Sequence, residues 1–373
     1  MTTPRVEVDL SKIRHNVECL VRRLSLRGIS VTGVTKAVRG NPSIARAMLE
    51  GGATDLADAR VSNVERLRKA GARCVVSLIR TPMLSQVDQV VRSCDISYNS
   101  EVEVIEQLAV ASCRAKTIQK IVLMVEMGDL REGLMPEDLG AVAQKVVEMH
   151  GVELKGIAAN FACLSGVSPD VATMQNFSDL STETEAVCGP FMEIVSGGNS
   201  SNLQWALGPW STGRVNNLRL GEAILLGRDP ISGDQIGGLF TDAFTLVSEV
   251  IETKVKTAHS PVALVDPTSR LPRLRPICDP LIRSIISIGR QDTDIDGLTF
   301  PPGMTCTGAT SDHTVVRSTL TPLRLGNEVR LQMNYSALTR IMSAPDTTTV
   351  FVGDGNRTRV GSIKRSGPSL QLV

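Results

Sequence analysis

Lys36 is the residue in this sequence best placed to do covalent chemistry. It follows a β-branched run, Val31-Thr32-Gly33-Val34-Thr35, that is typical of a strand buried on both faces. Gly40, Asn41 and Pro42 then break the pattern, and proline suits the first turn of a helix. The lysine is therefore predicted at the carboxyl end of a strand, where α/β barrels and open α/β sheets bind ligands. We expect it to be partly desolvated, which favours the neutral amine as nucleophile or base. A solvated cap residue is the alternative.

A second candidate is the segment Ser196-Gly197-Gly198-Asn199-Ser200-Ser201, which precedes a predicted helix. Its glycines would let backbone N–H groups approach a ligand, its serines supply hydroxyls, and the helix N-terminus adds positive potential. These features indicate a phosphate site, although an ordinary turn that caps a helix is the alternative. An amine beside a phosphate site fits pyridoxal phosphate, bound to Lys36 as a Schiff base. The sequence has no Gly-x-x-x-x-Gly-Lys-Ser/Thr motif, which disfavours a nucleoside triphosphate.

The elements that would position these residues alternate between strands and helices. Strands are predicted near residues 31–35, 55–57, 74–79, 95–98, 121–125, 154–159, 191–195 and 217–220. Helical spacing occurs near residues 13–24, 44–49, 61–70, 84–91, 102–111, 136–149 and 171–187, with a shorter helix after residue 199. Eight strand–helix units predict a (β/α)8 barrel of the TIM type. An open doubly wound sheet is the alternative.

The character of the sequence changes after about residue 227. Helical periodicity fades, and β-like runs lie near residues 243–250, 262–265, 281–288, 314–316, 328–333 and 348–352. We therefore predict a barrel over residues 10–230 and a mostly-β domain over residues 231–373, which includes an N-terminal strand within residues 1–9. Residues 353–373 are expected to form turns or a frayed tail.

Composition narrows the class of protein. The chain has 373 residues, of which 42% are hydrophobic and 21% charged, and its net charge is +1. The length and composition predict a globular protein of two domains. The small net charge predicts no electrostatic field strong enough to attract nucleic acid or an anionic membrane. We expect no signal peptide and no membrane span. Eight scattered cysteines without a Cys-x-x-Cys pair suggest reduced, mostly core thiols in a cytoplasmic protein, and four separated histidines suggest no metal cluster.

Several motifs at the predicted strand ends resemble one known family. They are Val34-Thr35-Lys36-Ala37, Leu56-Ala57-Asp58-Ala59-Arg60, Met127-Gly128-Asp129-Leu130-Arg131-Glu132-Gly133, Ser196-Gly197-Gly198-Asn199-Ser200-Ser201, Asn217-Leu218-Arg219-Leu220-Gly221-Glu222 and Ile288-Gly289-Arg290-Gln291-Asp292. Together they are similar to the fold-type III pyridoxal phosphate enzymes typified by alanine racemase, and most of all to its ornithine racemase branch. The resemblance runs from about residue 5 to about residue 345.

The resemblance implies a role for each matching position. Lys36 resembles the Schiff-base lysine, which is also the base for one face of the substrate. Ser200 and the backbone at Gly221 and Glu222 correspond to the phosphate site. Arg131 resembles the arginine near the ring hydroxyl, and Asn160 stands where alanine racemases usually have a histidine. Arg290 and Asp292 are implied to lie near the substrate.

Arg219 resembles the arginine that faces the pyridine nitrogen of the cofactor. A guanidinium has no acceptor and stays protonated, so it donates a hydrogen bond and leaves the ring nitrogen unprotonated. The ring is then a weaker electron sink, which favours reprotonation at Cα over transamination and so suits racemisation. An ion pair that closes the barrel is the alternative.

The second catalytic base departs from the family pattern. Alanine racemases use a tyrosine from the β domain of the partner subunit, but Tyr98 and Tyr335 of this chain fall elsewhere. The candidates are Asp266, Asp312, His313 and Asp292, and His313 titrates in the useful pH range. For His313, a surface turn is the alternative.

The resemblance implies a pyridoxal phosphate-dependent amino-acid racemase that works by two-base proton transfer as a homodimer. The substrate would be ornithine, lysine or another small amino acid such as serine or alanine. A cofactor-binding homeostasis protein without turnover is one alternative, although such chains consist of the barrel alone. A lyase or decarboxylase with the same cofactor is another.

Overall fold

The computed structural model describes residues 3–189, 191–256, 264–265, 272–273, 281–320 and 322–353. The chain divides into two compact units. One unit spans residues 9–243, and the other combines residues 1–8 with residues 244–373.

The first unit is a closed barrel of parallel strands in the order β2 to β9. The strands are β2 Ser30–Val34, β3 Asp55–Asp58, β4 Val76–Leu78, β5 Ile96–Asn99, β6 Gln119–Val125, β7 Val152–Ala159, β8 Ile194–Ser196 and β9 Asn217–Leu220. The barrel closes where β2 pairs with β9, with Thr32 opposite Arg219. The predicted (β/α)8 barrel is therefore confirmed, and the open sheet is excluded.

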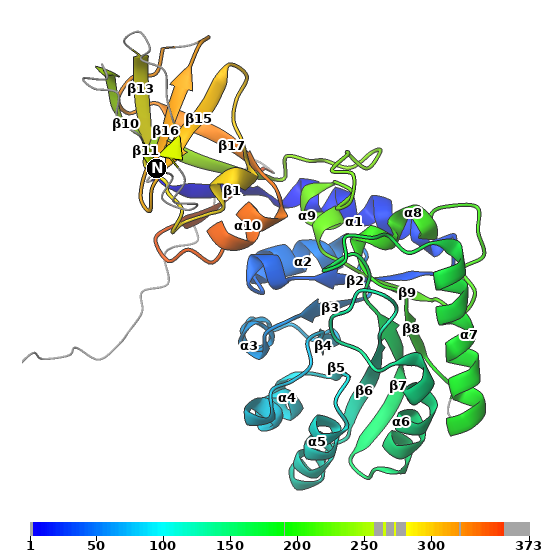
Figure 1. Ribbon diagram of the computed structural model, residues 1–373. Coiled ribbons are helices and arrows are strands. Elements are labelled where there is room, and N and C mark those ends of the chain that lie inside the picture. The colour runs from blue at the N-terminus through cyan, green and yellow to red at the C-terminus, as the bar shows by residue number, and fades with distance from the viewer. Residues whose placement is uncertain are drawn as a thin grey trace, which may run out of the picture. The chain divides into compact units, whose positions relative to one another are not determined.

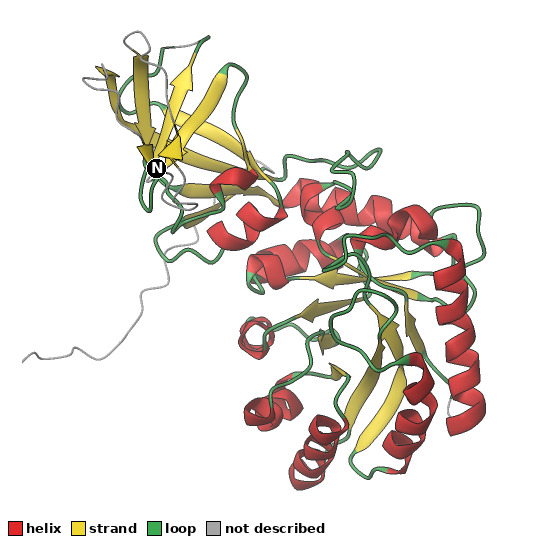
Figure 2. Ribbon diagram, in the orientation of Figure 1, coloured by secondary structure: helices red, strands yellow, loops and turns green. Residues whose placement is uncertain are grey.

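Helices cover the outside of the barrel (Figures 1 and 2). They are α1 Leu10–Ser25, α2 Pro42–Glu50, α3 Val61–Lys69, α4 Val87–Ser93, α5 Val102–Ala115, α6 Pro136–Glu148, α7 Val171–Cys188, α8 Leu203–Ala206 and α9 Glu222–Leu226. Short 3-10 helices η1 Lys36–Val38, η2 Leu84–Gln86 and η3 Ser200–Asn202 lie among them. Local chemistry sets the helix starts: the Asp9 side chain caps α1, and Asn41 caps α2 with Pro42 in its first turn.

The barrel strands are apolar because both of their faces are covered. In β6, residues 121–125 are all buried, as the unbroken apolar run predicts. Ile96, Tyr98, Val122, Met124 and Ala158 from β5, β6 and β7 pack into one buried cluster. Tyr98 brings a hydroxyl into this apolar layer, and burial raises its pKa.

The second unit is mostly β structure, as predicted. Its sheet contains β1 Arg5–Asp9, β10 Phe244–Lys256, β13 Leu281–Ile286, β14 Leu298–Thr299, β15 Met304–Ala309, β16 Thr314–Ser318, β17 Glu328–Met333 and β18 Thr348–Val352. A separate pair consists of β11 Leu264–Val265 and β12 Pro272–Arg273, and the helices are α10 Tyr335–Ile341 and η4 Ile295–Gly297. Buried Arg5 ties β1 to β17 through two hydrogen bonds of 2.7 and 2.8 Å to Glu328. The predicted tail after residue 353 lies outside the described residues.

Two composition-based expectations can be compared with the structure. The cysteines in the described part are free thiols, but only Cys19 and Cys94 are buried, so the prediction of mostly core thiols is wrong. Among the described helices, none combines the length and apolar character that crossing a bilayer would require.

Candidate active site

Lys36 lies where the sequence predicts it, just beyond the carboxyl end of β2 and at the first position of η1. The residue before it is held firmly: Thr35 Oγ1 donates to Asp58 Oδ2 at 2.7 Å, and Gly40 N donates to Thr35 O at 3.1 Å. The Lys36 side chain itself is exposed. The expectation that it is partly desolvated is therefore wrong for this structure.

Asp58 fixes this turn and was missed as a functional candidate. It is fully buried at the end of β3, and it also accepts from Arg60 N and Asn63 Nδ2, both at 2.9 Å. Burial raises the pKa of Asp58, while its hydrogen-bond donors oppose the rise. The carboxyl thus joins the Lys36 turn to the start of α3. Because Asp58 lies within the motif of residues 56–60, that motif could have indicated a role for its carboxyl group.

Arg219 is buried, and both of its terminal nitrogens donate hydrogen bonds. Nη1 donates to Ser196 Oγ at 2.5 Å and to Ser196 O at 3.3 Å. Nη2 donates to Ala159 O at 2.6 Å and to Asn160 Oδ1 at 2.9 Å. The Tyr98 ring lies 5.2 Å from Cζ, in cation–π range. No carboxylate in the described part contacts Arg219 directly, so the alternative of a barrel-closing ion pair is wrong.

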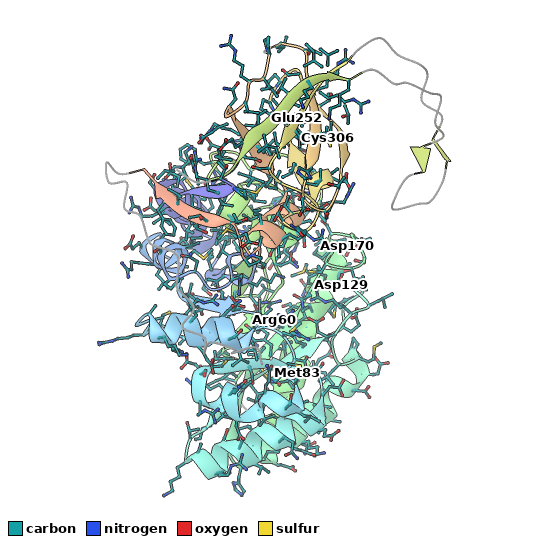
Figure 3. The ribbon with its side chains drawn as sticks, turned by 90° about the vertical axis from the view of Figure 1, so that its left-hand side faces the viewer. Arg60, Met83, Asp129, Asp170, Glu252 and Cys306 are labelled. Carbon is teal, nitrogen blue, oxygen red and sulfur yellow. The ribbon has the colours of Figure 1, made fainter. Side chains whose placement is uncertain are left out.

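A chain of hydrogen bonds extends from Arg219 to Arg131. Asn160 Nδ2 donates to Glu132 Oε1 at 2.9 Å, and Arg131 Nη2 donates to the same oxygen at 2.8 Å. Asp129, labelled in Figure 3, lies on the loop after β6, and its Oδ2 is 3.8 Å from Arg131 Nε. We call the set Arg131, Glu132, Asn160, Arg219 and Ser196 the Arg219 network. Glu132 and Ser196 thus connect the predicted candidates Arg131, Asn160 and Arg219. The sequence analysis did not predict a role for these two connecting residues.

The predicted phosphate loop is shaped largely by its own packing. Gly198 has a φ of +116°, and a Cβ there would lie 2.2 Å from Asn202 Oδ1. Asn199 accepts from Ser201 N at 2.9 Å and donates to Phe161 O at 2.8 Å. The glycines therefore serve the turn itself. The helix that follows is short, as predicted, because it consists of the single turn η3 and the four-residue helix α8.

Ser200 connects this loop to the start of α9. It is buried, and its Oγ accepts from Ala223 N at 3.2 Å. Gly221 caps α9 at the end of β9, so Ser200, Gly221 and Glu222 come together as predicted. The Glu222 side chain adds an unexpected feature: burial raises its pKa to about 7, against the opposing charge of Lys36.

The remaining candidates belong to the second unit. Asp312 and His313 are exposed on the turn between β15 and β16, and Gln291 Nε2 hydrogen-bonds to Asp312. Asp292 accepts from Gly289 N at 2.9 Å, and burial raises its pKa. Arg290 Nη1 lies 3.4 Å from Asp296 Oδ2. These four residues thus lie on two connected turns, whereas Asp266 lies outside the described residues.

A family model described as "Alanine racemase, N-terminal domain" matches residues 8–229. The chain belongs to the alanine racemase family. It is 32% identical to the lysine racemase of Thermotoga maritima over 362 residues, covering 94% of this chain and 99% of the relative. It is 31% identical to the ornithine racemase of Acetoanaerobium sticklandii over 342 residues, covering 90% and 96%. Members of the family are amino-acid racemases that use pyridoxal phosphate. This chain is therefore an amino-acid racemase that uses pyridoxal phosphate.

Solved structures share the fold across both units of the chain. Alanine racemase of Clostridium difficile 630 aligns with a TM-score of 0.76 at 17% identity, covering 97% of this chain and 99% of that one. D-threonine aldolase from Filomicrobium marinum aligns with a TM-score of 0.73 at 15% identity, covering 94% and 90%. Because the identity is low, these likenesses concern the fold alone. The match covers both units, so the shared fold includes the β unit as well as the barrel.

The side chains at the barrel mouth fit pyridoxal phosphate. Arg219 is a buried cation held by neutral acceptors, so a neutral ring nitrogen is a compatible additional acceptor. Ser200 and the start of α9 offer a hydroxyl and backbone N–H groups for a phosphate. Lys36 offers an accessible primary amine for the aldehyde.

Proposed function

We propose that this racemase interconverts the enantiomers of a basic amino acid such as lysine or ornithine. The support is the similarity to a lysine racemase and an ornithine racemase, each over nine-tenths or more of both chains. The matches to proteins named alanine racemase cover about half of this chain or less, for example 54% and 42%. A basic side chain therefore suits the full-length relatives better than alanine does.

The observation that carries the chemistry is the burial of Arg219. Its guanidinium stays charged even though burial lowers its pKa, because an arginine in a protein remains protonated at physiological pH. In our proposal its third nitrogen, Nε, donates to the ring nitrogen of the cofactor and keeps a proton off that nitrogen. When bound, pyridoxal phosphate makes the substrate's Cα–H acidic by drawing electrons toward its ring. A weak electron sink favours return of a proton to Cα. When the proton returns on the opposite face, the configuration at Cα is inverted.

The other residues of the site would hold the cofactor and move protons. Lys36 would bind the cofactor's aldehyde carbon and, when displaced by the substrate, exchange the proton on one face of Cα. Ser200 and the N–H groups at the start of α9 would bind the phosphate. Arg131, oriented by Glu132, would donate to the ring hydroxyl.

A second base would exchange the proton on the opposite face. We propose that it comes from the β unit of a partner subunit, with Asp312, His313, Asp292 and Asp266 as candidates. Asp312 and His313 are exposed, so both can reach outward from the turn that carries them. Since the barrel and the donor of the second base would belong to different subunits, the active form would be a homodimer.

The substrate proposal is tested with the holoenzyme and a panel of L- and D-amino acids, read by chiral chromatography. We expect kcat/KM for lysine or ornithine to exceed that for alanine and serine by at least about 100-fold, which corresponds to roughly 3 kcal/mol of discrimination. Faster racemisation of alanine than of any basic amino acid would overturn the substrate proposal. Release of CO2 or ammonia without racemisation would replace it with a lyase or decarboxylase.

The dimer proposal is tested by mixing two inactive variants, Lys36→Ala and a variant in which Asp312 and His313 are both replaced by alanine. Random mixing gives hybrid dimers that hold one intact site, so activity should return to about a quarter of the wild-type value. The Lys36→Ala variant mixed with itself is the control. If sedimentation finds dimers but mixing restores nothing, the second base is not Asp312 or His313 of a partner.

A further inference from the structure

Asp129 is a buried carboxylate at the barrel mouth for which the proposed function gives no role. It lies on the loop of residues 126–135 between β6 and α6, which we call the β6 loop, and its side chain is 3% exposed. Its Oδ1 accepts from Leu164 N at 2.9 Å, from Ser165 N at 3.2 Å and from Ser165 Oγ at 3.3 Å. Its Oδ2 is also buried, accepts no hydrogen bond from the described residues and lies 3.8 Å from Arg131 Nε. A buried carboxylate oxygen without a donor is costly, so the charge of Asp129 calls for an explanation.

Arg131 uses two of its three guanidinium nitrogens within the protein. Nε and Nη2 donate to the two carboxylate oxygens of Glu132, Nη2 at 2.8 Å. Nη1 makes no hydrogen bond to the residues that the structure describes, so its N–H groups are left for a ligand. Because Arg131 and Glu132 are consecutive residues of one loop, their pairing alone does not fix either of them relative to the barrel. Asn160 supplies one connection, through its bond of 2.9 Å to Glu132, and Asp129 supplies another.

Asp129 reaches the rest of the barrel through the loop of residues 160–170 between β7 and α7, which we call the β7 loop. Near the start of this loop, Phe161 O accepts from Asn199 Nδ2 of the predicted phosphate loop at 2.8 Å. Ala162 has a φ of +58°, a left-handed conformation that is unfavourable for a residue other than glycine and persists where the surroundings support it. The β7 loop is thus bonded to the phosphate loop near its start and to Asp129 a few residues later.

We propose that Asp129 positions Arg131 against the ring hydroxyl of the cofactor, with Oδ1 bonded to the β7 loop and the charge of Oδ2 acting on the guanidinium. The inference rests on the proposed function for the role of Arg131, and it adds a residue that the proposed function does not use. An attraction between opposite charges at a buried site is screened by salt much less than one at the surface. Asp129 is therefore a positioning residue, which acts on the cofactor through Arg131.

The test compares two ligands that differ only in the ring hydroxyl, pyridoxal phosphate and 3-deoxypyridoxal phosphate. Their Kd values are measured with the cofactor-free protein by equilibrium dialysis. Asp129→Asn keeps an oxygen for Leu164 N and Ser165 N and removes the charge beside Arg131. We expect the Kd for pyridoxal phosphate to rise about three- to tenfold, within the range of couplings between residues of one ion-pair network. The Kd for the deoxy compound should stay at the wild-type value, because it has no hydroxyl for Arg131 to bind.

The two Kd values together separate positioning from other effects. A partly unfolded variant weakens both ligands alike, so lowered stability does not imitate the expected result. Equal weakening of both ligands would overturn the proposal, because Asp129 would then only hold the loops. No change for either ligand would also overturn it. So would tighter binding of pyridoxal phosphate, since a carboxylate that acts directly on the ring oxygen repels it, and its loss strengthens binding.

Asp170→Asn is the matched control, at the other end of the β7 loop. Asp170, labelled in Figure 3 with Asp129, is exposed, and its Oδ1 accepts from Thr173 N at 2.7 Å at the start of α7. Asparagine caps a helix about as well as aspartate does, so both Kd values should match wild type. A change in the ratio of the two Kd values as large as that in Asp129→Asn would contradict a specific role for Asp129.

Arg131→Gln distinguishes failure of this inference from failure of the proposed function. If Arg131→Gln keeps the wild-type ratio of the two Kd values, Arg131 does not bind the ring hydroxyl, and both its proposed role and that of Asp129 are wrong. If Arg131→Gln loses the preference for pyridoxal phosphate while Asp129→Asn keeps it in full, only the role of Asp129 is wrong.

Discussion

The two sides of the barrel mouth are built in opposite ways. On one side, the Arg219 network is buried and hydrogen-bonded from Ser196 to Glu132, mostly through neutral acceptors. On the other side, Lys36 is exposed, and Glu222 has no hydrogen-bond partner within the described part of the chain. The first side holds a fixed geometry, because each bond restrains its neighbours. The second side leaves the Lys36 side chain accessible.

The largest effect is expected from a change in the rigid side, Arg219→Lys. Lysine cannot reproduce four bonds to Ser196, Ala159 and Asn160, so the free energy of unfolding should fall by about 2–4 kcal/mol. We expect kcat for racemisation to fall at least about 100-fold, since positioned electrostatic groups commonly contribute that much. Urea unfolding and chiral chromatography measure the two quantities.

Arg214→Lys is the matched control for this prediction. Arg214 pairs with Glu185 at 2.6 and 2.8 Å, but it is only half-buried. The same replacement there should cost less than about 1 kcal/mol and leave kcat unchanged. Similar losses in both variants would mean that the Arg219 network has no special rigidity.

Asn160→Leu should break the network in its middle. The variant loses the bond from Arg219 and the bond to Glu132 together, which should lower the free energy of unfolding by about 1–3 kcal/mol. We expect kcat/KM to fall about tenfold, because Arg131 and Arg219 lose their common support. An unchanged kcat/KM with lowered stability would show that the network is structural only.

Ser200→Ala tests the phosphate site, and Ser201→Ala is its neighbour control. Removing the Ser200 hydroxyl should raise the Kd for pyridoxal phosphate about tenfold, as expected for one lost hydrogen bond to a charged group. Ser201 Oγ already bonds to Asn199 at 2.8 Å and to Phe161 O at 3.2 Å, so its loss should lower stability and leave the Kd near wild type. Equal Kd changes would contradict the assignment to Ser200.

The smallest effect is a pH-dependent one at Glu222. Its pKa in the folded chain, about 7, lies above the ordinary value of 4.5, so the folded state binds this proton more tightly than the unfolded state does. The stabilisation is present below about pH 4.5 and is lost as pH rises toward 7. Between pH 5 and 8, wild type should lose on the order of 1 kcal/mol more than Glu222→Gln, measured in the cofactor-free protein. Parallel curves would contradict the raised pKa.

The barrel was predictable because its strands are short apolar runs bounded by turn signals. A parallel barrel also gathers the carboxyl ends of its strands, which is why Lys36 could be chosen from its place after a strand. Arg219 and Asn160 were chosen through the family resemblance. The elements missed were β12, β14, β15, α9 and α10. β12 and β14 have two residues each, α9 has five, and β15 is largely exposed, so their hydrophobic patterns are weak.

Contacts between side chains of different strands could not be predicted in the same way. Spacing along the chain placed Arg131 and Asn160 on two loops, but it did not reveal that Glu132 bridges them. The exposure of Lys36 was also misjudged, because a strand end predicts a location and not the direction of a side chain. The raised pKa of Glu222 depends on burial and on Asp229, neither of which the motif displays.

The central claim is that Lys36 carries the cofactor. Borohydride reduction of the holoenzyme, followed by peptide mapping, tests it most directly, because reduction makes the bond between the lysine nitrogen and the cofactor's carbon permanent. We predict one phosphopyridoxyl group per chain, on the peptide that contains Lys36, and none in Lys36→Ala. A label on another lysine, or no label in a protein that still racemises amino acids, would contradict the account.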